Sequence, residues 1–179
     1  MFKISIENPN SADAEAIAYL NVNTWKNTYL DLLPRDFVEG KKVTEKNINA
    51  WYHTVTNQNK ENIVFIARAE NSDILGFVWG GKARDNIQNI PVELYAIYVS
   101  PEYQRKGIGT ALFTHFFDYI QELGFKRMYL WVLHNNPSTI FYEKMRGIKT
   151  QHTKEYMNTY EENFIFSVRE LHDESSQVR

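Results

Sequence analysis

Two glycines separated by one residue, Gly107 and Gly109, lie between a β-type segment and a helical segment and directly follow two cations, Arg105 and Lys106. Such a turn can hold an anion, because unpaired backbone N–H groups and the positive end of the helix dipole converge where the helix begins. The missing Cβ atoms let a phosphate approach, and the two cations add formal charge. The spacing therefore predicts a phosphate-binding turn, although on the glycines alone a helix cap that binds only water is an equal alternative.

Two common phosphate motifs do not match this turn. A P-loop requires Gly-x-x-x-x-Gly-Lys-Ser/Thr, and the sequence has no such string. A dinucleotide-binding fingerprint requires a third glycine three residues after Gly109, and that position is Leu112. The turn therefore does not match the phosphate loops of P-loop proteins or of dinucleotide-binding proteins, and a different phosphate-containing ligand is expected.

The wider string Gln104-x-x-Gly107-x-Gly109, which follows a strand and a Pro-Glu-Tyr turn, resembles the acetyl-CoA pyrophosphate loop of the GCN5-related N-acetyltransferase (GNAT) family. A second block, Asn135-Asn-Pro-Ser-Thr-Ile-Phe-Tyr-Glu-Lys144, is similar to that family's Asn-x-x-Ala-x-x-Phe-Tyr-Glu-Lys-x-Gly-Phe segment. The likeness covers about residues 62–170. It departs from the family's pattern at Ser138, where alanine is usual, and at Ile148, where phenylalanine is usual.

The resemblance implies acetyl-CoA as the cosubstrate and no metal ion. The glycine turn would hold the pyrophosphate, the end of the preceding strand would pair with the pantetheine amides as an added strand does, and the start of the second block would line the pantetheine arm. The residues assigned to the cosubstrate are Ile97, Tyr98, Val99, Gln104, Arg105, Lys106, Gly107, Ile108, Gly109, Thr110, Asn135 and Ser138.

Acetyl transfer to an amine requires a neutral amine and a stabilised leaving thiolate. A lysine-like amine has a pKa near ~10.4, so its deprotonation at neutral pH costs roughly 4.6 kcal/mol. The resemblance makes Glu93, which lies before Gln104 on the central strand, the candidate base, and places the Tyr142 hydroxyl near the sulfur as the candidate acid. For Glu93, a solvated strand-end glutamate or a purely substrate-binding role is the alternative. Because side chains alternate between the two faces of a strand, Glu93 is predicted to share a face with Tyr95, Ile97 and Val99.

The acceptor side depends on the segment Trp25-Lys-Asn-Thr-Tyr29, which resembles the first helix of some polyamine and small-amine acetylators in the family. In the family fold this helix and the 82–90 loop wall the acceptor pocket, so Trp25, Tyr29 and Tyr95 are the candidate acceptor contacts. We therefore expect an N-acetyltransferase in which a primary amine, most simply a small and polyamine-like one, attacks acetyl-CoA directly. Two alternatives stay open: acetylation of protein N-termini or lysines, and a non-catalytic acyl-CoA sensor.

Alternating and helical apolar patterns predict the elements that position these residues. Strands are expected at 2–7, 63–70, 74–82, 92–99, 127–133, 151–156 and 163–170. Helices are expected from a Ser11 N-cap to about 28, at 44–56, at about 108–123 and at 138–146. A helix joins strands 92–99 and 127–133, which makes them a parallel pair. The expected fold class is α/β, with a mixed, mostly antiparallel twisted sheet flanked by helices, and the resemblance implies that the parallel pair splays around the cosubstrate.

Composition sets the remaining bounds. A chain of 179 residues with 43% hydrophobic and 23% charged residues is typical of one globular domain, expected at 1–171 with a polar tail at 172–179. A net charge of −2 without a basic stripe argues against nucleic-acid partners. No apolar run approaches the ~20 residues of a membrane span, and no apolar N-terminal segment suggests secretion, so a cytoplasmic protein is expected. The absence of cysteine excludes disulfides and thiolate chemistry. A homodimer stays open.

Overall fold

The computed structural model describes residues 3–167. The strands are β1 (Ile4–Glu7), β2 (Asn62–Ala69), β3 (Ile74–Lys82), β4 (Val92–Val99), β5 (Arg127–Leu133), β6 (Ile148–Tyr156) and β7 (Thr159–Ser167). The helices are α1 (Ala14–Tyr29), α2 (Arg35–Gly40), α3 (Glu45–Thr56), α4 (Ile108–Glu122) and α5 (Thr139–Lys144), with short 3-10 turns at Ser11–Asp13 and Pro101–Tyr103.

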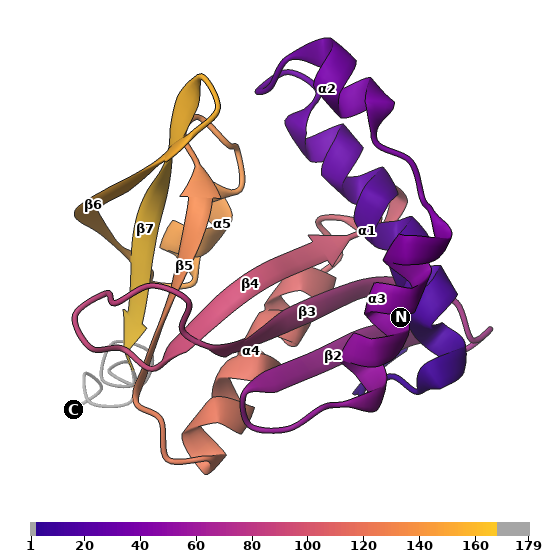
Figure 1. The fold of residues 1–179 in the computed structure, drawn as a ribbon. Coiled ribbons are helices and arrows are strands. Elements are labelled where there is room, and N and C mark those ends of the chain that lie inside the picture. Colours follow the sequence, from indigo (N-terminus) through magenta and orange to yellow (C-terminus); the bar gives the residue numbers. More distant parts are fainter. Residues whose placement is uncertain (1–2, 168–179) are drawn as a thin grey trace.

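The strands form one seven-stranded sheet in the order β1-β2-β3-β4-β5-β7-β6 (Figure 1). Neighbouring strands pair antiparallel everywhere except between β4 and β5, which are parallel and are joined through α4. The predicted mixed sheet with one parallel pair is therefore confirmed.

Helices cover both faces of the β2–β4 part of the sheet. The apolar stripe of α4, represented by Ile108, Leu112 and Phe116, packs on one face. On the other face α1 and α3 bury Ile17 and Trp51 against β2 and β3. Full burial of a large apolar side chain contributes about 1.5–3 kcal/mol, so these two layers hold the sheet that carries the glycine turn.

Several predicted boundaries need correction. Asn10, and not Ser11, caps the first helical turn, because its side chain accepts a hydrogen bond from the Ala12 amide and the Asp13 carboxylate accepts one from the Asn10 amide. Helix α2 was not predicted: it has six residues, of which Val38 is the buried one, too few for a periodic signal.

The last two strands also differ from the prediction. Strand β6 begins at Ile148 and not at 151. Strand β7 begins at Thr159 and not at 163, because the two strands close through a two-residue turn in which Met157 has a φ of 52°. The end of the predicted strand 163–170 and the predicted tail 172–179 lie outside the described residues, as does the start of the predicted strand 2–7.

A β-bulge interrupts β4 at Tyr95. Trp79 of β3 pairs with Ala96, but the next residue, Gly80, pairs with Leu94, which leaves Tyr95 as the extra residue. Strict alternation therefore fails, and Leu94 packs into the same core as Ile97. Adjacent strand residues point to opposite faces, so the predicted shared face for Glu93, Ile97 and Val99 is wrong.

Strands β4 and β5 separate soon after they meet. Their register contains two pairs, Glu93 with Tyr129 and Leu94 with Leu130. Beyond Leu94 the edge of β4 that faces β5 has no strand partner within the described residues, whereas β5 continues in register with β7. Figure 1 shows the resulting V between β4 and the β5–β7 pair. The splayed parallel pair that was expected is present.

A substitution at Gly80, which pairs with Leu94 beside the bulge, tests how tightly the bulge is packed. A Cβ atom there would lie 2.5 Å from Cζ of Phe116 and 2.6 Å from the carbonyl oxygen of Glu93. Gly80→Ala should therefore lower the free energy of unfolding in urea titrations by about 1–3 kcal/mol, the usual cost of overpacking. In Gly40→Ala the new Cβ has no heavy atom within 4 Å, so the free energy should change by less than about 0.5 kcal/mol. Equal effects of the two variants would contradict this packing.

Candidate active site

A cleft occupies the gap where β4 and β5 part. The bulged half of β4, the middle of β5, the inner side of α1 and the start of α5 form its walls. Its lining residues are Thr24, Thr28, Tyr29, Leu94, Tyr95, Ala96, Ile97, Tyr98, Val99, Gln104, Leu130, Trp131, Val132, Asn136, Ser138 and Tyr142. The cleft therefore exposes backbone groups of β4 that lack a strand partner, together with several hydroxyl and amide side chains.

The glycine turn has the geometry of an anion site. Gly107 is the N-cap of α4 with a φ of 84°, a conformation that favours glycine, and no side chain caps the helix there. The first turn contains no acidic residue. Arg105 and Lys106 are exposed beside it, whereas the Ile108 side chain is buried in the core, so Ile108 can offer only its amide. These observations fit a pyrophosphate at the amides of 108–110.

Gln104 links this turn to the end of β4. Its side-chain Nε2 donates a hydrogen bond to the Val99 carbonyl oxygen at 3.1 Å. Val99 in turn pairs with Gly76 of β3, so the turn is tied to the rigid part of the sheet. An extended ligand that leaves the turn would pass directly along the unpartnered edge of β4.

Tyr142 lies on α5 and closes the deep side of the cleft. The residue is 8% exposed and packs near Phe164, at a ring distance of 6.1 Å. Among residues 3–167 its hydroxyl has no hydrogen-bond partner, although it borders the cleft. Burial raises the pKa of Tyr142, so the phenol keeps its proton at neutral pH. It is therefore a proton donor without an acceptor from the protein.

The side chains predicted for the acceptor lie in two places. Tyr29 and Tyr95 line the cleft, whereas Trp25 lies beside it, with its ring 4.8 Å from that of Tyr29. The Tyr98 side chain packs against the cluster that contains the α1 residues Ala14, Ile17 and Ala18, and burial raises the pKa of both Tyr29 and Tyr98. Tyr98 thus contributes a side chain to the α1 wall as well as the backbone that was predicted.

In the segment 135–144, Asn136 and not Asn135 lines the cleft. Asn135 is exposed with a φ of 63° and borders a neighbouring hollow beside Pro101 and Pro137. Asn136 is 4% exposed, and its Oδ1 accepts a hydrogen bond from the Ser138 amide at 2.9 Å. The bond leaves the Asn136 amide nitrogen for a ligand. Two adjacent asparagines before a proline were the only available signal, and they do not say which of the two points inward.

Glu93 does not line the cleft. It is 1% exposed, and its carboxylate accepts hydrogen bonds from the Arg84 backbone at 2.9 Å, from the Arg84 guanidinium and from the Tyr129 hydroxyl at 3.0 Å. The hydrogen bonds to Glu93 raise the pKa of Arg84. Because this carboxylate is engaged by protein donors and does not border the cleft, it is not placed to contact an acceptor amine there.

The same network fixes the loop before β4. The Asp85 amide donates to the Tyr129 hydroxyl at 3.0 Å, and the Asp85 carboxylate accepts from Trp131 at 3.0 Å and from Lys154 at 2.9 Å. The Lys154 contact lowers the pKa of Asp85. The loop is thus connected to β4, β5 and β6 at the base of the V.

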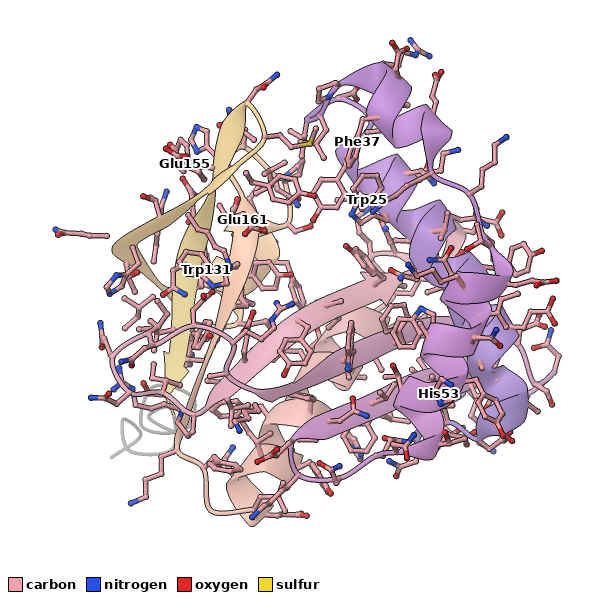
Figure 2. All side chains as sticks on the ribbon, viewed as in Figure 1. Trp25, Phe37, His53, Trp131, Glu155 and Glu161 are labelled. Carbon is pink, nitrogen blue, oxygen red and sulfur yellow. The ribbon has the colours of Figure 1, made fainter. Side chains whose placement is uncertain are left out.

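Glu161, which no sequence pattern indicated, points into the opening in front of the cleft. It lies on β7 opposite Leu133 of β5 and Lys154 of β6. Figure 2 shows Glu161 and Trp25 directed at this opening from its two sides. Burial raises the pKa of Glu161. The Glu161 charge, after burial, also contributes to the raised pKa of Tyr29 across the opening. Within the described part of the chain no hydrogen bond or ion pair reaches its carboxylate.

Glu93→Gln should destabilise the protein, because it removes charged hydrogen bonds at a buried position. The expected loss is about 1–3 kcal/mol in the free energy of unfolding. Glu39 offers a matched control, because its ion pair with Arg35 is exposed, and Glu39→Gln should cost only about 0.3–0.5 kcal/mol. Urea titration of both variants measures the difference, and similar losses would show that the Glu93 network adds little to stability.

Glu161→Gln, in contrast to Glu93→Gln, should raise the free energy of unfolding at neutral pH. Because burial raises the folded-state pKa of Glu161 above 4.5, the folded protein binds this proton more tightly, and stability falls as pH rises through the raised value. Glutamine carries no charge to desolvate, so the variant should be the more stable protein at pH 7, with the advantage vanishing below pH 4.5. Thermal unfolding across this pH range measures it. A stability gain that does not change with pH, or one that the exposed Glu155→Gln reproduces, would contradict the assignment.

Among residues 3–167, no three or more histidine, cysteine, aspartate or glutamate side chains are grouped as in a metal site. No helix in this part of the chain combines the length and the apolar character needed to cross a bilayer.

Comparison with known proteins connects this geometry to a family. The model described as "Acetyltransferase (GNAT) family" matches residues 25–148. The uncharacterised N-acetyltransferase YuaI of Bacillus subtilis (strain 168) is 30% identical over 140 residues, which cover 78% of either chain. The spermidine N(1)-acetyltransferase of Thermoplasma acidophilum is 26% identical over 155 residues, 84% of this chain and 88% of that relative.

Solved structures agree at the level of the fold. The crystal structure of PaiA N-acetyltransferase from Thermoplasma acidophilum in complex with coenzyme A aligns with a TM-score of 0.70 at 19% identity, covering 92% of this chain and 99% of that one. The family match extends over most of the chain and includes the end of α1, the glycine turn and Tyr142. The protein belongs to the GNAT family of acetyltransferases.

Proposed function

We propose that this protein is an acetyl-CoA-dependent N-acetyltransferase that acetylates a primary amine of a small molecule by direct attack. The observation that carries the proposal is Tyr142, a buried phenol that has no hydrogen-bond acceptor among residues 3–167 and that lies beside the unpartnered edge of β4. Family membership supports the reaction class, and the name of the spermidine-acetylating relative supports a small amine as acceptor.

The cosubstrate would be held in three places. The amides of 108–110, with Arg105 and Lys106, would bind the pyrophosphate. The free edge of β4 from Ile97 to Val99 would pair with the pantetheine amides, because unpaired backbone groups in a cleft need partners. Asn136 and Ser138 would contact the arm from the opposite wall, a role in which Asn136 replaces the predicted Asn135.

In the reaction, the neutral acceptor nitrogen attacks the carbonyl carbon of the thioester. A carbon–nitrogen bond forms, the carbon–sulfur bond breaks, and the sulfur leaves with the electron pair. The Tyr142 hydroxyl donates its proton to that sulfur, and the proton released by the nitrogen restores the phenol directly or through solvent. A donor aimed at the developing charge stabilises the transition state more than the ground state.

Glu93 fits a positioning role better than the predicted role of general base. Its donors, Arg84 and Tyr129, hold the carboxylate away from the cleft. We propose that Glu93 keeps β4 and β5 paired at the base of the V and keeps the 83–91 loop in place. Proton removal would then depend on acceptor molecules that are already neutral or on water in the cleft.

Tyr142→Phe tests the assignment of the acid. Loss of the hydroxyl should reduce kcat about 10²–10⁴-fold, the usual contribution of general acid–base catalysis, with little change in the affinity for acetyl-CoA. The assay follows free thiol released from acetyl-CoA with a panel of amines, and calorimetry measures cosubstrate binding.

Tyr52→Phe is the matched control, because that tyrosine is 47% exposed on α3, and its kcat should equal that of the wild type. Unchanged turnover of Tyr142→Phe would remove Tyr142 from the mechanism. Cosubstrate binding without amine-dependent thiol release by the wild type would instead favour the non-catalytic sensor.

A further inference from the structure

We propose that Glu161 binds a second ammonium group of the acceptor, so that the preferred substrates are diamines or longer polyamines in which one amine reacts and another stays charged. This inference rests on the proposed function, because it requires acetyl transfer at the cleft that contains Tyr142. It names the substrate class and the residue that selects it.

Among residues 3–167, the carboxylate of Glu161 has no hydrogen-bond or ion-pair partner. Lys154, its neighbour on β6, is 2.9 Å from Asp85, and Arg84 is paired with Glu93. The described charged groups that act on one another here are therefore three carboxylates, of Glu161, Asp85 and Glu93, and two cations, Lys154 and Arg84. Both cations already form ion pairs with the other two carboxylates. A half-buried carboxylate without a compensating group is unfavourable, and a cationic ligand supplies what is missing.

The surroundings of Glu161 suit an alkylammonium chain. Leu133, on the facing residue pair, belongs to an apolar cluster that also includes Trp25, Tyr29 and Tyr156. Burial, together with the charge of Glu161, raises the pKa of Tyr29 and of Tyr156. Figure 2 shows Glu161 directed at the opening that Trp25 also faces. Methylene groups can lie against aromatic side chains while the terminal ammonium reaches the carboxylate.

The amine held by Glu161 cannot be the one that reacts first. Glu161 is not part of the cleft lining that contains Tyr142 and the β4 edge. A carboxylate also raises the pKa of an ammonium group beside it, which keeps that nitrogen protonated and prevents nucleophilic attack. The reacting amine must therefore be a second group of the same molecule, farther inside the cleft.

The same charge selects against other acceptors. An amino acid or other carboxylate-bearing amine would bring a like charge to Glu161, and like charges in a half-buried site are costly. A monoamine of equal length would leave the Glu161 charge uncompensated. Glu161 thus determines the acceptor specificity: it binds acceptors that carry a second cation more tightly and acceptors that carry an anion more weakly.

The decisive experiment compares 1,4-diaminobutane with butylamine, which differ in one terminal amine, as acceptors for the wild type and for Glu161→Gln. We expect Glu161→Gln to raise KM for the diamine about tenfold or more, the size of a lost charge-assisted contact, and to change KM for butylamine less than twofold. Glu155→Gln is the control, because Glu155 is exposed at the outer edge of the same hairpin (Figure 2), and it should match the wild type with both amines.

A pH series adds an independent readout. The charged or titratable groups that act on Glu161 are Lys154, Arg84, Glu93 and Asp85, with the Tyr29 and Tyr156 phenols on the facing elements. Below the raised pKa of Glu161 the wild type should lose its preference for the diamine, although both diamine nitrogens stay protonated. Glu161→Gln should have no preference to lose.

The failures can be told apart. A wild type that binds coenzyme A but releases no thiol with any amine refutes the proposed function itself. A wild type that acetylates amines, combined with an unchanged diamine KM in Glu161→Gln, refutes only the role of Glu161. An equal rise of KM for the diamine and for butylamine also refutes it, because such a rise reports a general disturbance of the cleft.

Discussion

The structure depends on the separation of β4 and β5 after only two residue pairs. Parallel strands normally continue their ladder, because every unpaired backbone group in a protein interior costs free energy. Here the bulge at Tyr95 turns the β4 backbone, and the buried Glu93 carboxylate ties β4, β5 and the Arg84 loop together at the last shared pair. The result is a sheet that is rigid at the base of the V and has open backbone groups above it.

That opening has two sides with different chemistry. On the side of α4, the glycine turn offers amides and cations, and Gln104 connects the turn to the end of β4. On the side of α1 lie the rings of Trp25 and Tyr29, and the half-buried Glu161 is directed at the same opening from β7. Tyr142 lines the cleft between these two sides. An uncompensated carboxylate lowers the stability of the empty protein, and such a cost is characteristic of groups retained for a ligand.

Sequence reasoning predicted the elements whose signal is local. The β-branched run of β4, the glycine turn, the amphipathic α4 and the block around Tyr142 follow from short patterns, and the structure contains these elements. The Tyr95 bulge could not be predicted, because it depends on how β3 and β4 pair, and its omission assigned Glu93 to the wrong face. Glu161 was missed for a related reason: only the pairing of β7 with β5 places this one of two adjacent glutamates beside α1. Residues far apart in sequence define the acceptor side, and single-sequence patterns do not contain such contacts.

The most direct test of the central claim is a map of backbone amide chemical shifts as coenzyme A is added to the uniformly ¹⁵N-labelled protein. If the separated edge of β4 and the turn that begins α4 form the binding site, the largest changes will occur at the amides of 96–99 and 107–110, with β1 and α3 unaffected. Saturable binding whose largest changes lie elsewhere, or no change in any amide at millimolar coenzyme A, would contradict the account.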